Sequence, residues 1–167
     1  MRLGGKIMVD FSWLKKYSGI KEDSGEYKHD FVPLNCKDIF VQEERLGCPF
    51  PMELREFYLQ VGYGIMCAQD EDYLNMIMAP NEVVDFMLGE GMYGNSGYRN
   101  EIDLKTKMVF LYAGDETYLC LDVGEKDSEG RCPVVYVKPT KCVVLARSLE
   151  EFAKKMDESM SYYVDVW

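Results

Sequence analysis

Apolar side chains recur with a helical period near the middle of the chain. Four of them stand at i, i+3, i+4 and i+7: Leu54, Phe57, Tyr58 and Val61. This spacing places them on one face of a helix, which can pack against a core. Pro51 suits the first turn because the N–H that proline lacks has no intrahelical partner there. Gly62 and Gly64 follow, and glycine readily takes the left-handed backbone that ends a helix. The pattern predicts a helix from Pro51 to Val61.

Three more helices are predicted from similar patterns. Residues 36–47 have helical apolar spacing and end at Leu46-Gly47, and a third helix begins at Pro80. The last helix has the strongest local signal. Ser148 and Glu151 match the S-x-x-E capping box, in which side chains accept backbone N–H groups at the helix start. Its expected inner face consists of Leu149, Phe152, Met156 and Met160.

Strands are expected between these helices, where β-branched and aromatic residues alternate with turn residues. The expected strands are Tyr73–Met78, Met108–Tyr112, Thr117–Val123, Val134–Lys138 and Cys142–Leu145. Gly114-Asp115-Glu116 lies between two of them and indicates a hairpin. N-terminal helices, a central, mostly antiparallel sheet and a closing C-terminal helix indicate an α+β fold in a single domain. We expect this domain at residues 36–167, after a loosely organised N-terminal extension over residues 1–35.

Several segments, in this order along the chain, resemble the SUKH superfamily of Smi/Knr-type domains. The first runs from Glu43 to Gly64, and the others are Ile77–Val84, Phe110–Tyr118 and Ser148–Phe152. Together these segments span most of residues 36–160. The resemblance implies a SUKH-like fold, and the bacterial members of this superfamily are mostly immunity proteins that bind and block a toxin domain. Two features depart from the family pattern: the Gly-Tyr-Gly stop at residues 62–64 and the long connection at residues 88–107.

Charge narrows the choice of partner. The 167 residues carry a formal net charge of −10, and residues 36–167 hold 13 basic and 24 acidic side chains. Such a surface repels nucleic acid and anionic membranes, because each phosphate contact needs a cation. It attracts a basic partner and can raise the association rate by ~10–1000-fold at low salt. Acidic surfaces also keep proteins soluble, so charge alone does not identify a partner.

The chain has no apolar run that approaches the length of a membrane span. Its N-terminus also lacks the apolar stretch of a signal peptide, so we expect a cytoplasmic protein, with Met8 as an alternative start.

No catalytic residue, cofactor site or metal site is predicted. The six cysteines contain no C-x-x-C pair and several lie in apolar runs, which favours reduced core thiols over zinc ligands. Residues 89–94 spell G-x-G-x-x-G, but they follow a predicted helix instead of a strand, which indicates a chance match to the dinucleotide motif. His29 is the only histidine and lies beside no nucleophile motif. The acid pairs are expected to be solvated: Glu43-Glu44, Asp115-Glu116 and Glu150-Glu151.

A protein-binding surface remains the best interpretation. We expect its partner-binding residues to be Tyr63, Asp70, Glu71, Asp72, Glu90, Tyr93, Tyr98, Asp115 and Glu116. Tyrosine supplies contact area and carboxylates steer a basic partner. Loop methionines such as Met66 and Met92 could add an adaptable surface.

The predicted function is that of an immunity protein, or antitoxin, that neutralises a cognate toxin domain by covering its active site. The acidic domain favours a basic toxin such as a nuclease. The alternative is a non-catalytic regulatory adaptor or scaffold. The sequence leaves the oligomeric state open.

Overall fold

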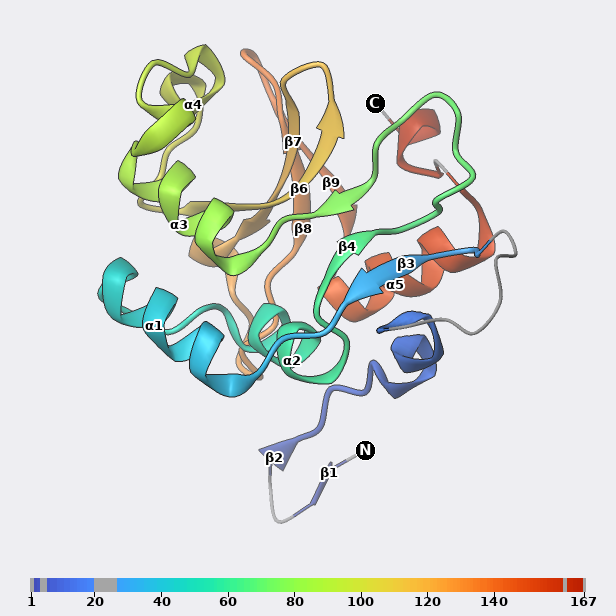
Figure 1. The fold of residues 1–167 in the computed structure, drawn as a ribbon. Coiled ribbons are helices and arrows are strands. Elements are labelled where there is room, and N and C mark those ends of the chain that lie inside the picture. Colours follow the sequence, from blue (N-terminus) through green and yellow to red (C-terminus); the bar gives the residue numbers. More distant parts are fainter. Residues whose placement is uncertain (1, 4–5, 20–26, 161, 167) are drawn as a thin grey trace.

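A seven-stranded antiparallel sheet runs through the middle of the molecule (Figure 1). The computed structural model describes residues 2–3, 6–19, 27–160 and 162–166. Neighbouring strands in the sheet are successive in the sequence, from β3 to β9. Their bounds are Asp30–Val32 (β3), Tyr63–Ile65 (β4), Met76–Ile77 (β5), Lys107–Gly114 (β6), Thr117–Asp122 (β7), Val134–Val137 (β8) and Cys142–Ala146 (β9). A separate small sheet pairs β1 (Arg2–Leu3) with β2 (Lys6–Ile7).

Helices lie on both sides of this sheet, with α3 and α4 on one side and α5 on the other (Figure 1). Phe86 of α3 packs against Tyr118 with ring centroids 5.0 Å apart, and Phe152 of α5 packs against Phe110 at 5.7 Å. The α-helices are α1 (Cys36–Leu46), α2 (Met52–Gln60), α3 (Pro80–Leu88), α4 (Gly97–Glu101) and α5 (Leu149–Glu158). The 3-10 helices are η1 (Ser12–Tyr17), η2 (Gly91–Tyr93), η3 (Val123–Glu125) and η4 (Tyr162–Val166). The predicted α+β single domain is confirmed.

The predicted helices form, and their ends follow the expected signals with small differences. Gly47 ends α1 with a φ of 85°, and Pro51 is the cap that precedes α2. At α5, the Ser148 hydroxyl accepts the backbone N–H of Glu151 at 3.1 Å. The Glu151 carboxylate accepts the N–H of Arg147 at 2.6 Å instead of reaching Ser148. Met160 lies beyond α5 and is exposed, so the predicted inner face ends at Met156.

The hairpin predicted at Gly114-Asp115-Glu116 forms between β6 and β7, and the strands expected at Val134–Lys138 and Cys142–Leu145 pair with each other as β8 and β9. The strand expected over Tyr73–Met78 is shorter, because only Met76–Ile77 pairs with its neighbours. The Asp70 carboxylate accepts the N–H groups of Asp72 and Tyr73, which holds the preceding residues in a loop. The long connection between α3 and β6 contains two short helices, η2 and α4, that no sequence pattern predicted.

The described part of residues 1–35 contributes to the core. Phe11, Leu14 and Phe31 are almost fully buried, and Phe31 lies in β3, the edge strand beside β4. Phe11 and Phe31 both pack edge-on against Phe57 of α2. The folded unit therefore begins before residue 36.

Two buried carboxylates hold the helices of this domain together. Glu53 of α2 accepts the backbone N–H groups of Leu149 and Glu150 at 3.1 and 2.9 Å, which caps the start of α5. Glu43 of α1 accepts the N–H of Phe50 at 2.8 Å and pairs with Arg55 at 3.1 Å. Glu43 is therefore not the solvated charge that its sequence suggests.

The cysteines are divided between core and surface. All six are free; Cys67, Cys120 and Cys132 are buried, whereas Cys36, Cys48 and Cys142 are exposed. The expectation of core thiols therefore holds for half of them.

Candidate functional site

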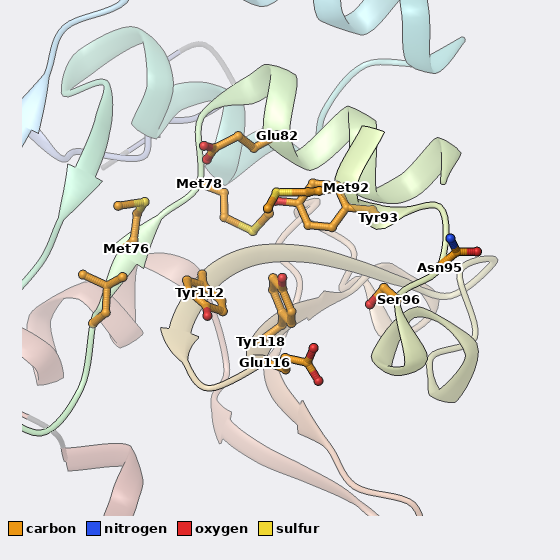
Figure 2. Close-up of a pocket in the computed structure, with 11 residues that line it drawn as sticks. Met76, Met78, Glu82, Met92, Tyr93, Asn95, Ser96, Tyr112, Glu116 and Tyr118 are labelled. Carbon is orange, nitrogen blue, oxygen red and sulfur yellow. The ribbon is translucent and has the colours of Figure 1, made fainter. Parts of the chain in front are cut away.

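A groove of about 450 Å³ opens between α3 and η2 on one side and the β6–β7 hairpin on the other (Figure 2). We call it the tyrosine groove. Its lining is rich in tyrosine, methionine and acidic side chains: Leu74, Met76, Met78, Glu82, Met92, Tyr93, Asn95, Ser96, Tyr112, Glu116 and Tyr118. It joins four separate parts of the chain, which the sheet order brings together.

The wall of the groove is a cluster of aromatic rings. Tyr112 and Tyr118 are opposite each other in the β6–β7 register, with ring centroids 5.0 Å apart. Behind them Tyr98 stacks on Tyr118 at 5.2 Å and donates its hydroxyl hydrogen to the Tyr118 carbonyl oxygen at 2.9 Å. Phe86 contacts both Tyr93 and Tyr118. Rings that are packed on several sides form a rigid surface, which lowers the entropy lost when a partner binds.

The hydroxyl groups of Tyr93, Tyr98 and Tyr118 stay protonated at neutral pH, because burial raises the pKa of each. Burial raises the pKa of Tyr93, and the nearby Glu82 and Asp85 carboxylates raise it further, while a hydrogen bond with Tyr118 acts in the opposite direction. Burial likewise raises the pKa of Tyr118, with Tyr93, Tyr112, Glu116 and Glu82 adding to the effect. The groove therefore offers neutral phenol groups in a negative electrostatic field.

The hairpin turn at the rim has a strained backbone. Asp115 and Glu116 have φ values of 48° and 57°, which is the left-handed pair that a two-residue turn between twisted strands requires. Asparagine and glycine take this conformation more readily than aspartate and glutamate do. Strained residues are common at functional sites. The turn brings the Glu116 side chain to the groove and leaves it exposed.

The methionines make the opposite rim adaptable. Met92 in η2 is 85% exposed, which is the largest exposed fraction among the large hydrophobic side chains that lie on the described surface. Met76 is half-buried and Met78 is buried, and both line the groove below α3 (Figure 2). Flexible, polarisable side chains of this kind adapt to the shape of a partner.

The groove carries negative charge without a basic side chain in its lining. Figure 2 shows Glu82 and Glu116 on opposite sides of the tyrosine rings. Glu82 lies at the start of α3, where its carboxylate accepts the N–H of Ala79 at 3.1 Å. The eleven lining residues include no lysine and no arginine. The arrangement is suited to binding rather than to proton transfer.

The structure brings together some of the residues that the sequence predicts for binding. Tyr93 and Glu116 line the groove, Asp115 occupies the same turn as Glu116, and Tyr98 supports the wall from behind. The loop with Asp70, Glu71 and Asp72 reaches the groove through Leu74, whose N–H donates to Ala113 of β6 at 3.2 Å. The Asp70 carboxylate accepts hydrogen bonds from backbone N–H groups of its own loop, whereas Glu71 and Asp72 are exposed.

Two predicted residues lie elsewhere. Tyr63 lines a different pocket, between α1 and the start of α3. Glu90 pairs with Arg45 of α1 at 2.7 Å, and Arg45 also pairs with Asp85 of α3 at 2.7 Å. Met66, a loop methionine in the sequence analysis, is fully buried. The predicted residues therefore do not form one continuous set.

Of the eleven lining residues, only Tyr93 and Glu116 belong to the predicted set. Glu82, Tyr112 and Tyr118 are among those that it lacks. The sequence shows them only as a helix start and two strand residues. The cross-strand pairing of Tyr112 with Tyr118 follows from the hairpin register, and this pairing is the signal that could have revealed them.

His29 lies in a second cluster that resembles a catalytic arrangement at first sight. It is fully buried, with Nε2 2.9 Å from the Asp157 carboxylate and Nδ1 accepting the backbone N–H of Cys67 at 2.9 Å. The Cys67 thiol contacts the carbonyl oxygen of Met156 at 3.2 Å instead, and burial raises its pKa to about 11. Both ring nitrogens are engaged and the thiol is protonated at neutral pH, so His29 cannot activate Cys67 in this geometry.

The structure gives no metal or nucleotide site in the region that it describes. There, no group of three or more histidine, cysteine, aspartate or glutamate side chains could hold a metal ion. The glycines at residues 89–94 follow α3 and lead into η2, which is not the strand-to-helix context of a dinucleotide site. Among the described helices, none combines the length and the apolar character needed to cross a bilayer.

Comparisons with known proteins give two matches. The sequence model of the SMI1 / KNR4 family (SUKH-1) matches residues 33–155. The chain is also 28% identical over 153 residues to "Immunity protein YxxD" of Bacillus subtilis (strain 168), an alignment that covers 90% of this chain and 96% of that relative. No solved structure matches with significance.

Proposed function

The chain belongs to the SMI1 / KNR4 family (SUKH-1), and from this premise we propose that it is an immunity protein that binds a cognate toxin domain and neutralises it. Its similarity to an immunity protein over nearly the full length of both chains supports this role. An inhibitor of this kind needs a stable surface that complements the toxin and no reaction of its own.

The tyrosine groove is the observation that carries the proposal. Its rigid ring cluster, the exposed Met92 and the carboxylates at its rims have the composition of a protein-binding centre, in which aromatic and methionine side chains are enriched. A stable interface buries about 800 Å² on each partner, which is more than a groove of this size offers. We therefore include in the interface the exposed residues next to the groove: Glu71, Asp72 and Asp115.

The proposed mode of action is occlusion. The toxin docks with a basic surface on the acidic rim of the groove, and the bound domain covers the toxin's active site. A net charge of −10 accelerates the approach of a basic partner, and a nuclease is a suitable class because its active site must attract phosphate. The immunity protein itself acts without catalysis and in the cytoplasm, where it would meet a toxin that has entered the cell.

The experiment that tests this function begins with affinity capture of the tagged protein from its own organism, eluted across a salt gradient and identified by mass spectrometry. A captured protein with a basic C-terminal domain is then expressed alone and with the immunity protein. Growth arrest by that domain, relieved by co-expression, and loss of its activity at one-to-one stoichiometry are the expected results. Capture of several unrelated proteins, none of them toxic, would favour the adaptor or scaffold alternative instead.

A further inference from the structure

Several carboxylates in this fold have a basic side chain beside them. Such pairs, with N–O distances of 2.7–3.1 Å, are Glu43 with Arg55, Asp85 and Glu90 with Arg45, Asp122 with Lys107, and Asp157 with Lys28. Within the described residues, no ion pair involves Glu82 or Glu116, the two carboxylates that line the tyrosine groove. The charge of the tyrosine groove is therefore left for a partner to neutralise.

The charges of Glu82 and Glu116 restrict which side chains of a partner can cover the groove. A partner that occludes it removes water from Glu82 and Glu116, and desolvation of a carboxylate is unfavourable unless a cation or hydrogen-bond donors replace the water. A neutral apolar side chain could fill the space among Met76, Met92 and Tyr112, but it would leave both carboxylates desolvated. An acidic side chain would add repulsion. A cationic side chain compensates the desolvated carboxylates and avoids the repulsion.

The rings offer the same cation a second interaction. Tyr93 and Tyr112 are half-buried, so part of each ring faces the groove. A cation over a tyrosine face is attracted by the negative charge of that face, and the attraction grows when water is excluded. Elsewhere in this molecule lysine ammonium groups lie 5.2–5.7 Å from the ring centroids of Tyr17, Tyr136 and Tyr162. The groove tyrosines have no such internal cation among the residues that line the groove.

We propose that the tyrosine groove binds an arginine or lysine side chain of the partner, held between Glu82 and Glu116 and against the rings of Tyr93 and Tyr112. The inference deepens the proposed function and rests on it for the identity of the partner. The long side chain enters between α3 and the β6–β7 turn, and Met92 closes over its aliphatic part. This residue is the anchor of the interface, and the surrounding contacts exclude water from it.

The first test uses a small probe and needs no toxin. The protein, labelled at its methionine methyl groups, is titrated with N-acetyl-arginine methylamide and, separately, with the neutral isostere N-acetyl-citrulline methylamide, while NMR spectra are recorded. We expect the arginine probe to shift the methyl signals of Met76 and Met92 with a dissociation constant on the order of 10 mM. N-acetyl-lysine methylamide, against its side-chain-acetylated form, shows whether an ammonium group serves as well.

Two variants locate the binding. Glu82→Gln/Glu116→Gln keeps the side-chain size and leaves an oxygen at residue 82 that can accept the Ala79 N–H, so this variant should fold and lose the arginine response. Glu44→Gln/Glu125→Gln removes the same charge from exposed positions outside the groove and should keep the response. Equal shifts with arginine and citrulline, no groove shift with either basic probe, or a response that survives the groove substitutions would overturn the inference.

The second test separates this inference from the proposed function. Affinity for the captured toxin is measured for the wild type and both double variants at several salt concentrations. The groove variant should bind at least about 10-fold more weakly and with a flatter salt dependence, whereas the control should change by less than about 3-fold. Unchanged toxin affinity in the groove variant would overturn the inference and leave the immunity function intact. An arginine-specific groove in a protein that neutralises no toxin would overturn the proposed function and leave the cation site standing.

Discussion

Two grooves on this protein both combine carboxylates, aromatic rings and methionine, and only one of these two has a basic side chain in its lining. A groove of about 790 Å³ lies between α1 and α2 and is lined by Phe40, Glu43, Glu44, Gly47, Cys48, Pro49, Phe50, Met52, Arg55 and Glu56. In this α1–α2 groove Arg55 lies 5.1 Å from the centroid of the Phe40 ring and pairs with Glu43. The protein thus supplies its own cation there, whereas the tyrosine groove has none in its lining.

The comparison shows why acidic and aromatic composition alone does not identify a binding site. In the α1–α2 groove the carboxylate, the ring and the cation already form a complete set, which stabilises the fold. In the tyrosine groove the same set lacks its cation and is completed only by another molecule. Substitutions of internally satisfied carboxylates should therefore lower stability, and substitutions in the tyrosine groove should lower affinity.

The largest loss of stability is expected from Glu53, the internally satisfied carboxylate that caps α5. Glu53→Ala leaves one buried and one partly buried N–H group without an acceptor, and it should lower the free energy of unfolding by about 2–4 kcal/mol in urea denaturation. Glu53→Gln keeps one acceptor oxygen and should lose less. Toxin affinity, measured where both variants are folded, should stay at the wild-type value. An alanine variant as stable as the wild type would show that this cap does not hold α5.

A smaller loss is expected from Arg55→Met, which removes the cation from the α1–α2 groove. Glu43 then keeps only the Phe50 N–H, and stability should fall by about 1–3 kcal/mol. The same variant should gain a response to N-acetyl-arginine methylamide at Met52, because its groove now resembles the tyrosine groove. Glu43→Gln/Arg55→Met is the control that should show no such response. If Arg55→Met gains none, the missing cation is not what distinguishes the two grooves.

A fall in pH should lower the stability of the fold through His29 and leave toxin binding at the tyrosine groove almost unchanged. Burial lowers the pKa of His29 below its ordinary value near 6.5, and the bond to Asp157 only partly offsets this. The unfolded chain therefore binds a proton more readily than the folded one, so stability is lost as pH falls below about 6.5, by at most about 1.4 kcal/mol per pH unit for one group. His29→Gln should abolish this part of the slope in urea titrations between pH 7 and pH 5.5. Toxin affinity should hardly change over that range, and a slope that persists in the variant would assign it to other groups.

The smallest expected effects come from a substitution at Glu116, which should raise stability and weaken toxin binding. Glu116→Gly places glycine at a φ of 57°, which relieves backbone strain and should raise stability by about 0.5–1 kcal/mol. It also removes one groove carboxylate and should weaken toxin binding by about 3- to 10-fold. Thermal denaturation tests the gain in stability, and a binding titration on the same sample tests the loss of toxin affinity. Glu125→Gly, in η3 outside the groove, should leave affinity unchanged; a stabilised Glu116 variant with full affinity would exclude this carboxylate from the interface.

Local sequence patterns were sufficient for most elements of the fold. The Gly47 stop, the Pro51 start and the Ser148 cap each depend on residues a few positions apart, and the helices they delimit form where predicted. The role of β3 could not be predicted in this way. Phe31 is buried because β3 pairs with β4, more than thirty residues further along the chain, and periodicity carries no information about such pairings.

The candidate site was predictable only in part, for the same reason. Tyr93, Tyr98 and Glu116 have side chains typical of binding surfaces, so composition drew attention to them. Glu82 and Tyr112 join the groove because β6 packs against α3, and neither stands out in the sequence. Glu90 is in the predicted partner-binding set, but it pairs with Arg45 of α1, which lies more than forty residues earlier in the chain.

The order of the strands has a consequence for how the protein is made. Because β3 to β9 pair in the order in which they are synthesised, each strand can join the sheet soon after it leaves the ribosome. The last groove residue, Tyr118, precedes β8, β9 and α5. A nascent chain therefore has every side chain of the groove before β8, β9 and α5 are translated, and a cell exposed to toxin would gain these recognition residues before the sheet of each new molecule is complete.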